Sequence, residues 1–282
     1  MSERRLRQRR ITLCADDYGI SRSVDQAIRD LLARRRINAT SVMVLAPAFD
    51  AAEARALQAL RDNGDAAVGL HVTLTAPFAP MSPGFRPLRD GAFPRLQTLL
   101  GLATARRLDP PSLSHEIAAQ LQAFADAFGT PPDFVDGHQH VQLFPQIRDA
   151  FLDAVARHAP QAWVRQCGRP AQQAGRWRDR KGLLLDILSV GFRRRAAQRG
   201  LRSNAAFAGT YDFRDDADVA ALFPRFFDGL PDGGLVMCHP GLVDAELRRL
   251  DPLTTLRERE YAYFGGEPFA RLLQDQGIVL HA

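Results

Sequence analysis

The sequence predicts an α/β protein folded as an irregular (β/α) barrel of about seven strands. Short β-type runs alternate with longer helical patterns along all 282 residues. This alternation is typical of a mostly parallel sheet with helices packed outside it. About seven such units suit the length of one barrel domain, and an open doubly wound sheet is the alternative.

The strands are predicted where short apolar runs are rich in β-branched residues or end abruptly in polar ones. The first run is apolar and ends in two acids, the second reads TSVMVL and the third AVGLHVTLT. In chain order, the predicted strands cover residues 11–17, 40–45, 67–75, 134–140, 163–167, 234–239 and 278–281.

The helices are predicted between these runs, where apolar residues recur at helical spacing. Ser21 is a candidate N-cap of the first helix and Ser112 of the third, and Pro145 fits the first turn of the fourth. The predicted helices cover residues 21–36, 50–61, 112–128, 145–158, 183–199, 217–227, 253–264 and 268–276.

Two segments interrupt the alternation of predicted strands and helices. Residues 76–111 contain seven prolines, and we expect so long an insertion to be a lid or a substrate-binding loop. A second insertion, rich in arginine, spans residues 168–182. We found no convincing domain boundary, so we expect a basic arm at residues 1–10 and a single catalytic domain at residues 11–282.

The composition excludes several classes of protein. With 46% hydrophobic and 24% charged residues, the chain is neither disordered nor fibrous, and without about 18 consecutive apolar residues we expect no transmembrane helix. Its three cysteines are too few for a disulfide framework. The basic N-terminus lacks the apolar stretch of a secretory signal. We therefore expect a cytoplasmic protein.

Polar residues gather at the predicted carboxyl ends of the strands, which form the active-site face of a parallel barrel. Four segments that are distant in sequence would bring them together. These residues are Asp16, Asp17, His71, Asp136, His138, His140 and His239.

Each of these residues also has a structural interpretation. His71 alone could be a core histidine, and the two acids alone could be a solvated strand end. His138 and His140 are stronger candidates, because spacing i, i+2 on a strand puts both imidazoles on one face. One carboxylate with two imidazoles leaves coordination positions open for water and substrate, which is typical of a catalytic metal site. Zn²⁺ suits such ligands, but the sequence does not decide between it and Mg²⁺ or other divalent ions.

An Asp-Asp strand end also occurs in phospho-receiver domains. These domains need a lysine late in the sheet, and the only lysine here, Lys181, lies in the arginine-rich insertion. Receivers are also much shorter, so we exclude this class.

Four segments resemble the signature motifs of the YdjC-like carbohydrate deacetylases, which include chitooligosaccharide and hopanoid-associated deacetylases. They read ADDYGIS at 15–21, GLHVTLT at 69–75, FVDGHQHVQLFP at 134–145 and MCHPG at 237–241. Four motifs in the same order across most of the chain are far more specific than any one of them.

The resemblance implies a distorted β/α barrel and one divalent metal ion, Mg²⁺ or Zn²⁺. It implies Asp17, His71 and His138 as the metal ligands, Asp16 as the catalytic base and His239 as the general acid. His140 and Asp136 would contact substrate or support a ligand, with His140 also open as an alternative ligand. Many relatives carry a third histidine where this chain has Gln142, which on a strand would share a face with His138 and alter substrate contacts.

The function implied is removal of the N-acetyl group from an N-acetylated amino sugar, on an oligosaccharide or a lipid-linked sugar. A metal-activated water would attack the acetamide. The alternatives are a metal-dependent hydrolase of another bond in carbohydrate metabolism, and a non-enzymatic module that binds anionic surfaces.

The arginines raise the question of partners. Basic patches that bind nucleic acid usually contain aromatic residues, and the sequence RRLRQRR has none, so we expect no nucleic-acid partner. The arm and the apolar run 183–192, bracketed by arginines that include Arg178, suggest peripheral contact with the anionic inner face of a membrane. A homo-oligomer stays open.

Overall fold

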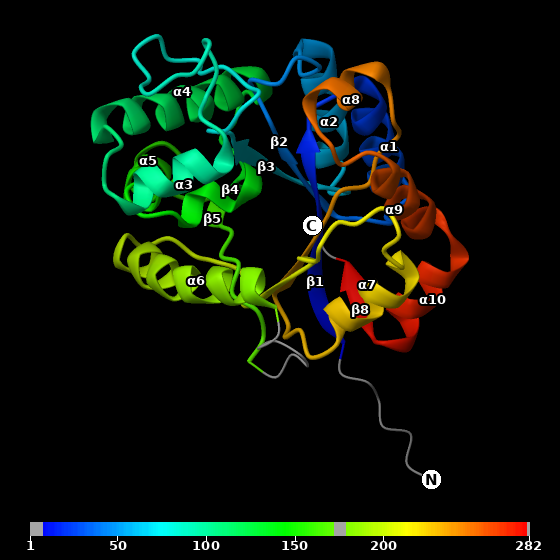
Figure 1. Ribbon diagram of the computed structural model, residues 1–282. Coiled ribbons are helices and arrows are strands. Elements are labelled where there is room, and N and C mark those ends of the chain that lie inside the picture. The colour runs from blue at the N-terminus through cyan, green and yellow to red at the C-terminus, as the bar shows by residue number, and fades with distance from the viewer. Residues whose placement is uncertain (1–7, 172–178, 281–282) are drawn as a thin grey trace.

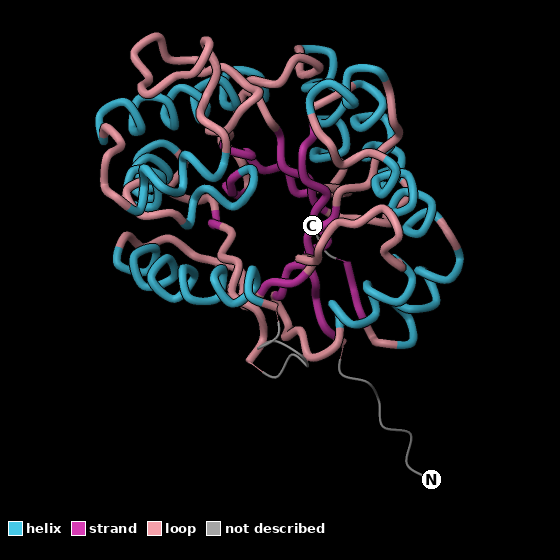
Figure 2. The backbone as a smooth tube through the Cα atoms, viewed as in Figure 1, coloured by secondary structure: helices cyan, strands magenta, loops and turns pink. Residues whose placement is uncertain are grey.

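The computed structural model describes residues 8–171 and 179–280. In this part of the chain eight parallel strands form one curved sheet inside a ring of helices (Figures 1 and 2). Seven strands follow the order β5-β4-β3-β2-β1-β7-β6, and β8 pairs with the beginning of β1. The strands are β1 (Arg9–Tyr18), β2 (Ala39–Val42), β3 (Ala67–Val72), β4 (Phe134–Gly137), β5 (Trp163–Val164), β6 (Phe207–Ala208), β7 (Gly234–Cys238) and β8 (Ile278–Leu280).

The two end strands of this order, β5 and β6, are joined only loosely. The Val164 amide donates to the Arg202 carbonyl and the Phe207 amide donates to the Gly168 carbonyl, both at 2.9 Å. These bonds lie beside the ends of two very short strands, so the sheet curls toward closure without a regular ladder there. The predicted irregular (β/α) barrel is therefore confirmed.

The helices cover the outside of the sheet (Figure 2). Ser21 caps the first helix as predicted, with its hydroxyl accepting from the Val24 amide, whereas Asp109, not Ser112, caps α4. The helices are α1 (Arg22–Ala33), α2 (Ala51–Asp62), α3 (Leu96–Thr104), α4 (Pro110–Phe128), the 3₁₀ helix η1 (His138–Leu143), α5 (Ile147–His158), α6 (Arg180–Gln198), α7 (Val219–Phe227), α8 (Ala245–Leu250), α9 (Thr255–Gly265) and α10 (Glu267–Asp275). No helix among the described residues is both long and apolar enough to span a bilayer.

The fourth strand is shorter than its predicted range, 134–140. β4 ends at Gly137, which pairs with Val72, the last residue of β3. Beyond this point neither neighbouring strand offers a partner, and the chain enters η1 with Gln139 and His140 at φ 56° and 60°. Positive φ is the left-handed region, which reverses the chain and ends the alternation of side chains.

Part of the proline-rich insertion, residues 76–111, packs into the hydrophobic core. It contains α3, and Phe85 and Phe93 are buried with their rings 4.9 Å apart, edge to face. Leu96, the first residue of α3, reaches the cavity described below. The insertion is therefore a packed part of the domain that contributes to the rim of that cavity.

Candidate metal centre and active site

A cavity of about 340 Å³ lies at the carboxyl ends of β1, β3, β4 and β7. It brings together six of the seven residues that the sequence singles out, while Asp136 is completely buried behind His71. The six residues that line the cavity are Asp16, Asp17, His71, His138, His140 and His239.

Asp16 and Asp17 both reach the cavity because β1 is irregular at its end. Neighbouring side chains on a regular strand point to opposite faces. Here the pairing register with β2 shifts between Ala15 and Tyr18, and Asp17 has φ 70°. The bulge turns the backbone so that two adjacent carboxylates enter one site, which is a common use of bulges near active sites.

Three side chains offer converging metal donors. Asp17 Oδ1 lies 3.3 Å from His71 Nε2 and 2.9 Å from His138 Nδ1. Donor atoms of all three residues lie within 4.8 Å of one another, and the three residues are buried. One carboxylate and two imidazoles at this spacing form a donor set that a divalent ion could bridge.

The Nδ1 nitrogen of His71 is hydrogen-bonded in the way that is usual for a metal-binding histidine. His71 Nδ1 donates to Asp136 Oδ1 at 2.6 Å, and Ser41 Oγ lies 3.0 Å from the same nitrogen. This leaves Nε2 as the nitrogen that faces Asp17. Metal-binding histidines usually have their other N–H bound to a carboxylate in this way, so the residues present fit a metal ion.

Asp17 is also held by a buried arginine. Arg257 Nη2 donates to Asp17 Oδ2 at 2.6 Å and to Asp251 Oδ2 at 2.8 Å. Burial alone would raise the pKa of Asp17, but His138 and Arg257 outweigh it and hold this pKa well below its usual value. Asp17 is therefore a carboxylate at neutral pH, with Oδ1 directed toward the two histidines.

Asp16 has a separate arginine. Arg165, which is completely buried, makes a two-pronged contact with Asp16, with Nη1–Oδ2 2.6 Å and Nη2–Oδ1 2.7 Å. Burial would raise the pKa of Asp16, but Arg165 and His71 lower it below the ordinary range. Asp16 is thus ionised and fixed in orientation.

A second group of potential metal donors, Cys14, Asp16 and Asp136, lies around the Arg165 guanidinium. Arg165 Nη2 lies 2.9 Å from Cys14 Sγ, 2.7 Å from Asp16 Oδ1 and 2.6 Å from Asp136 Oδ2. The guanidinium already supplies the positive charge among these groups. Only the group around Asp17 is then left to receive a metal ion among the described residues.

His239 directly follows β7 and borders the cavity. Its backbone amide donates to Glu260 Oε2, and Tyr211 donates to Glu260 Oε1, each at 2.5 Å. Burial lowers the pKa of His239 to about 4, against the opposing effect of Asp17. Within the described part of the chain, His239 Nδ1 is buried without a hydrogen-bond partner, while the residue itself borders the cavity.

His138 and His140 do not lie on a strand, as was predicted, because β4 ends at Gly137, but both residues line the cavity. His138 contacts Asp17, whereas His140 Nδ1 lies 3.5 Å from Cys167 Sγ and its ring meets Phe207 edge to face at 5.5 Å. The left-handed backbone at Gln139 and His140 accompanies this difference in partners. Burial lowers the pKa of His140 to about 3, so its imidazole is neutral.

Gln142 is also not where strand alternation places it. It is fully buried, and its side-chain amide donates to the Arg165 carbonyl at 3.2 Å. Gln142 is absent from the described lining of the cavity. It supports the segment that carries Arg165.

The sequence analysis missed Arg165, Arg257, Lys181 and Phe213. Lys181 Nζ lies 5.3 Å above the Phe213 ring, and Phe213 meets the His239 ring edge to face at 5.3 Å. Arg165 lies in the middle of the predicted strand 163–167 and directly follows the shorter observed strand β5, so no strand-end signal in the sequence pointed to it. Arg257 lies in the middle of a predicted helix and gave no such signal.

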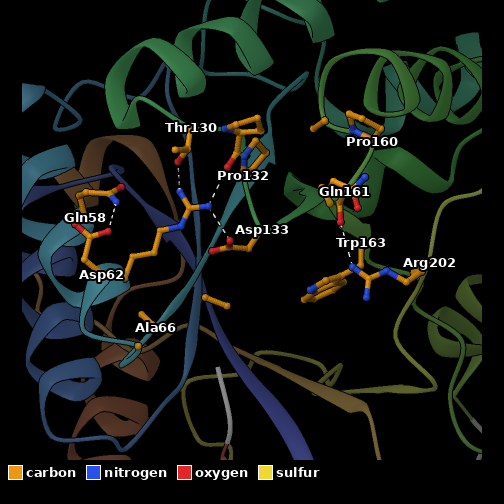
Figure 3. A pocket seen from close by; sticks show the side chains of 16 residues that line it. Gln58, Asp62, Ala66, Thr130, Pro132, Asp133, Pro160, Gln161, Trp163 and Arg202 are labelled. Carbon is orange, nitrogen blue, oxygen red and sulfur yellow. Dashed lines mark hydrogen bonds and ion pairs between the residues drawn. The ribbon is translucent and has the colours of Figure 1, made fainter.

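A larger hollow of about 1,000 Å³ lies at the opposite end of the sheet, beside the amino ends of β3, β4 and β5 (Figure 3). Its wall includes Trp163 and Arg61. The Arg61 guanidinium donates hydrogen bonds to the Thr130 hydroxyl and, at 2.7 Å, to the Asp133 carboxylate. No histidine or cysteine is among the described residues of this wall. The smaller cavity is therefore the one equipped for catalysis.

The chain is similar to proteins of one family over nearly its whole length. Residues 10–275 match the family described as YdjC-like protein. A chitooligosaccharide deacetylase of Citrobacter koseri is 31% identical over 249 residues, which are 86% of this chain and 85% of that protein. The chitooligosaccharide deacetylase of Salmonella typhimurium is 29% identical over 248 residues, with the same coverage.

Solved structures share the fold. An Enterococcus faecalis protein, named as a candidate for cellobiose-phosphate cleavage, has a TM-score of 0.76 at 18% identity, with 97% of each chain covered. A carbohydrate esterase of family 4 from Streptococcus mutans has a TM-score of 0.51 at 13% identity, covering 98% of this chain and 86% of that one.

Proposed function

Because the chain belongs to the YdjC-like family, we propose that it is a metal-dependent hydrolase that removes the N-acetyl group from an N-acetylated amino sugar. One observation carries this proposal. A carboxylate and two imidazoles with converging donor atoms share a cavity with a second carboxylate and a further imidazole. That set provides for a metal ion, a base and an acid, which amide hydrolysis requires.

We assign Asp17, His71 and His138 as ligands of one divalent ion, Mg²⁺ or Zn²⁺. When bound, such an ion would polarise the acetamide carbonyl and lower the pKa of a water molecule. Asp136 and Arg257 act as positioning residues, because each holds one ligand through a short contact, 2.6 Å in both cases.

Asp16 is assigned as the base. Arg165 keeps it ionised and oriented, so it can accept the proton of the attacking water at neutral pH. His239 is assigned as the acid that protonates the departing sugar amine. It is neutral in the free protein, so it takes up a proton from solvent as negative charge develops on the substrate beside it, passes this proton to the amine, and the proton accepted by Asp16 returns to solvent. The products are acetate and a free amino sugar.

The remaining cavity wall suits a sugar. Leu96, Phe213 and Leu253 offer apolar surface, while Lys181 and His140 offer polar groups. Sugar rings present both kinds of surface, and binding sites combine an apolar wall with a few placed polar groups. We assign a cytoplasmic location, in keeping with three buried, unpaired cysteines.

The proposal is tested by measuring acetate release from N-acetylated oligosaccharides, nucleotide sugars and lipid-linked sugars. The chelated protein is assayed with and without Mg²⁺, Zn²⁺, Mn²⁺ or Co²⁺. We expect release that depends on an added ion and is lost in Asp16→Asn. Cleavage of a glycosidic or phosphoester bond without acetate release, or acetate release that persists in the Asp16→Asn protein, would overturn it.

A further inference from the structure

Helix α6 carries an exposed apolar stripe. Among the described residues, the large hydrophobic side chains that are exposed are Met81 and three on α6, namely Leu184, Ile187 and Val190. The three on α6 are 44%, 63% and 60% exposed. Their spacing of three residues puts them on one side of the helix. They are separate from the side of the helix that is buried through Leu185, Ser189 and Phe192.

The stripe begins near the mouth of the catalytic cavity. Lys181, in the first turn of α6, lines that cavity, and Leu184 lies one turn further along the helix. Figure 1 shows α6 at the outer edge of the ring of helices, with α5 as its neighbour. The apolar surface and the active site therefore open on adjoining parts of the molecule.

Both ends of the stripe are positively charged. Arg180 and Lys181 precede it, and Arg193, Arg194 and Arg195 follow it, all five exposed. Arg195 pairs with Asp149 at 3.4 Å, but Arg180, Arg193 and Arg194 have no ion pair with any described residue. The acid on α6, Asp186, is buried and paired with Arg169. Most of the positive charge on this face is therefore not neutralised by the residues that the structure describes.

We propose that this face of α6 is a docking surface for an anionic lipid membrane. A helix with an apolar stripe and basic residues beside it can lie in the headgroup region, burying the stripe while the arginines meet anionic lipids. Docking along α6 brings the mouth of the catalytic cavity to the level of the headgroups.

Charge argues against a second copy of the chain as the occupant. Two-fold pairing of α6 with itself in an antiparallel arrangement would set Arg180 and Lys181 of one copy against Arg193 and Arg194 of the other. Both ends carry the same sign, so the pairing is repulsive, whereas an anionic membrane surface is complementary to both ends at once.

The proposed membrane contact through α6 does not depend on the N-terminal arginines. Arg9 belongs to β1 and donates to the carbonyls of Phe227 and Leu230, and Arg10 pairs with Asp232. They lie at the amino end of β1, away from the cavity. Arg4, Arg5, Arg7 and Arg178 lie outside the described residues, so the predicted contact through the arm remains a prediction.

The test is co-sedimentation of the full chain with vesicles of phosphatidylcholine containing increasing phosphatidylglycerol, at low and high salt. We expect binding that grows with the anionic lipid content and weakens with salt. The triple variant Leu184→Ser, Ile187→Ser, Val190→Ser should bind at least about tenfold more weakly. Met81→Ser, an exposed apolar residue elsewhere, is the matched control and should bind like wild type.

A second pair of variants tests the charge. Arg193→Gln with Arg194→Gln should weaken binding by about fivefold per arginine. Arg55→Gln with Arg107→Gln removes the same charge from other exposed positions and should have a smaller effect. These residues are outside the catalytic site, so acetate release from a soluble substrate should be unchanged, and the outcome is independent of the proposed reaction.

Two results would overturn the inference. One is no binding to strongly anionic vesicles at low salt, or equal binding by the triple variant and wild type. The other is a dimer, seen by light scattering, that the triple variant converts to monomer while wild type fails to bind vesicles. A second copy would then be the occupant of the stripe.

Discussion

Two adjacent buried carboxylates, Asp16 and Asp17, are kept ionised with the help of separate arginines, Arg165 and Arg257. Arg165 contacts Asp16, while Arg257 and the imidazole of His138 contact Asp17. Without these partners the two like charges would repel, and one carboxylate would take up a proton. The separate partners give the two neighbours different surroundings, as the proposed roles of base and metal ligand require.

Substitution of the two carboxylates should therefore have different effects. Asp17→Asn should lose bound metal, because it removes the charged donor between His71 and His138. Asp16→Asn should keep the metal yet lower acetate release by roughly 10²–10⁴-fold, the usual size of an acid–base contribution. Elemental analysis of the purified proteins measures the first effect and acetate release the second.

The histidines supply the controls for this experiment. His71→Ala and His138→Ala should lose metal like Asp17→Asn, and His239→Ala should keep it while lowering the rate. Equal metal content in Asp16→Asn and Asp17→Asn would show that the division of roles between these neighbours is wrong.

The point at which each strand ends determines the positions of the functional side chains that follow it. β1 and β7 were predicted to within two residues at each end, because their apolar runs stop at Asp16 and His239. The end of β4 was not predicted correctly, because the pattern FVDGHQH looks like a strand along its whole length. Only the lengths of its neighbours and the left-handed backbone at Gln139 and His140 end it.

The two arginines show why part of the site escapes sequence analysis. Arg165 lies 149 residues from Asp16 and Arg257 lies 240 residues from Asp17. An arginine in a chain rich in arginine is ordinarily a surface residue. Its burial beside a carboxylate depends on how distant elements pack, which local patterns do not report.

The segment that joins β6 to α7 depends on Gly209. This glycine has φ 106°, and a Cβ there would come within 2.2 Å of the Met237 carbonyl oxygen in β7. Gly209→Ala should therefore destabilise the protein by about 3 kcal/mol or more, through backbone strain and overpacking. Urea unfolding measures the change.

Gly200→Ala is the matched control, because Gly200 also has positive φ, 73°, but its Cβ would meet nothing within 4 Å. We expect it to cost only about 1–2 kcal/mol, the strain of an alanine in this conformation. Equal losses in the two variants would mean that close approach to Met237 contributes nothing.

The beginning of α1 contains a carboxyl group that makes stability depend on pH. Asp25 is fully buried, its Oδ1 accepts the Gly19 amide at 2.5 Å, and its Oδ2 has no hydrogen-bond partner among the described residues. Burial raises the pKa of Asp25 from 3.8 to about 7. The folded protein therefore binds this proton more tightly than the unfolded chain does.

The stabilising effect of that proton is complete below about pH 4 and is lost as the pH rises to about 7. The loss is on the order of 4 kcal/mol, from roughly three pKa units at about 1.4 kcal/mol each. Asp25→Asn cannot titrate, so its free energy of unfolding should exceed that of wild type by more at about pH 8 than at about pH 5. Urea unfolding at both pH values measures this, and a difference that does not change with pH would contradict the assignment.

At the scale of the whole molecule, we expect the scaffold not to depend on the proposed metal ion. The core runs through the sheet and the surrounding helices and includes buried aromatic side chains such as Phe134, Phe151 and Phe223. The polar groups of the metal centre are already paired within the protein, with Asp17 on Arg257 and His71 on Asp136. Loss of the ion therefore leaves no uncompensated buried charge there.

Chelation should consequently abolish activity without unfolding the protein. An ion that binds only the folded state stabilises it by about 3 kcal/mol at a concentration 100 times its Kd. For a chain of this size, 1 kcal/mol corresponds to about 2–4 °C in Tm. Treatment with EDTA should therefore lower Tm by no more than about 10 °C.

The unfolding transition should stay cooperative and the far-UV circular dichroism should not change. Asp17→Asn, measured with and without EDTA, is the control, because a variant without the ion should show no shift on chelation. Loss of secondary structure in the chelated wild type would mean that the ion, and not the packed barrel, holds the ends of β1, β3 and β4 together.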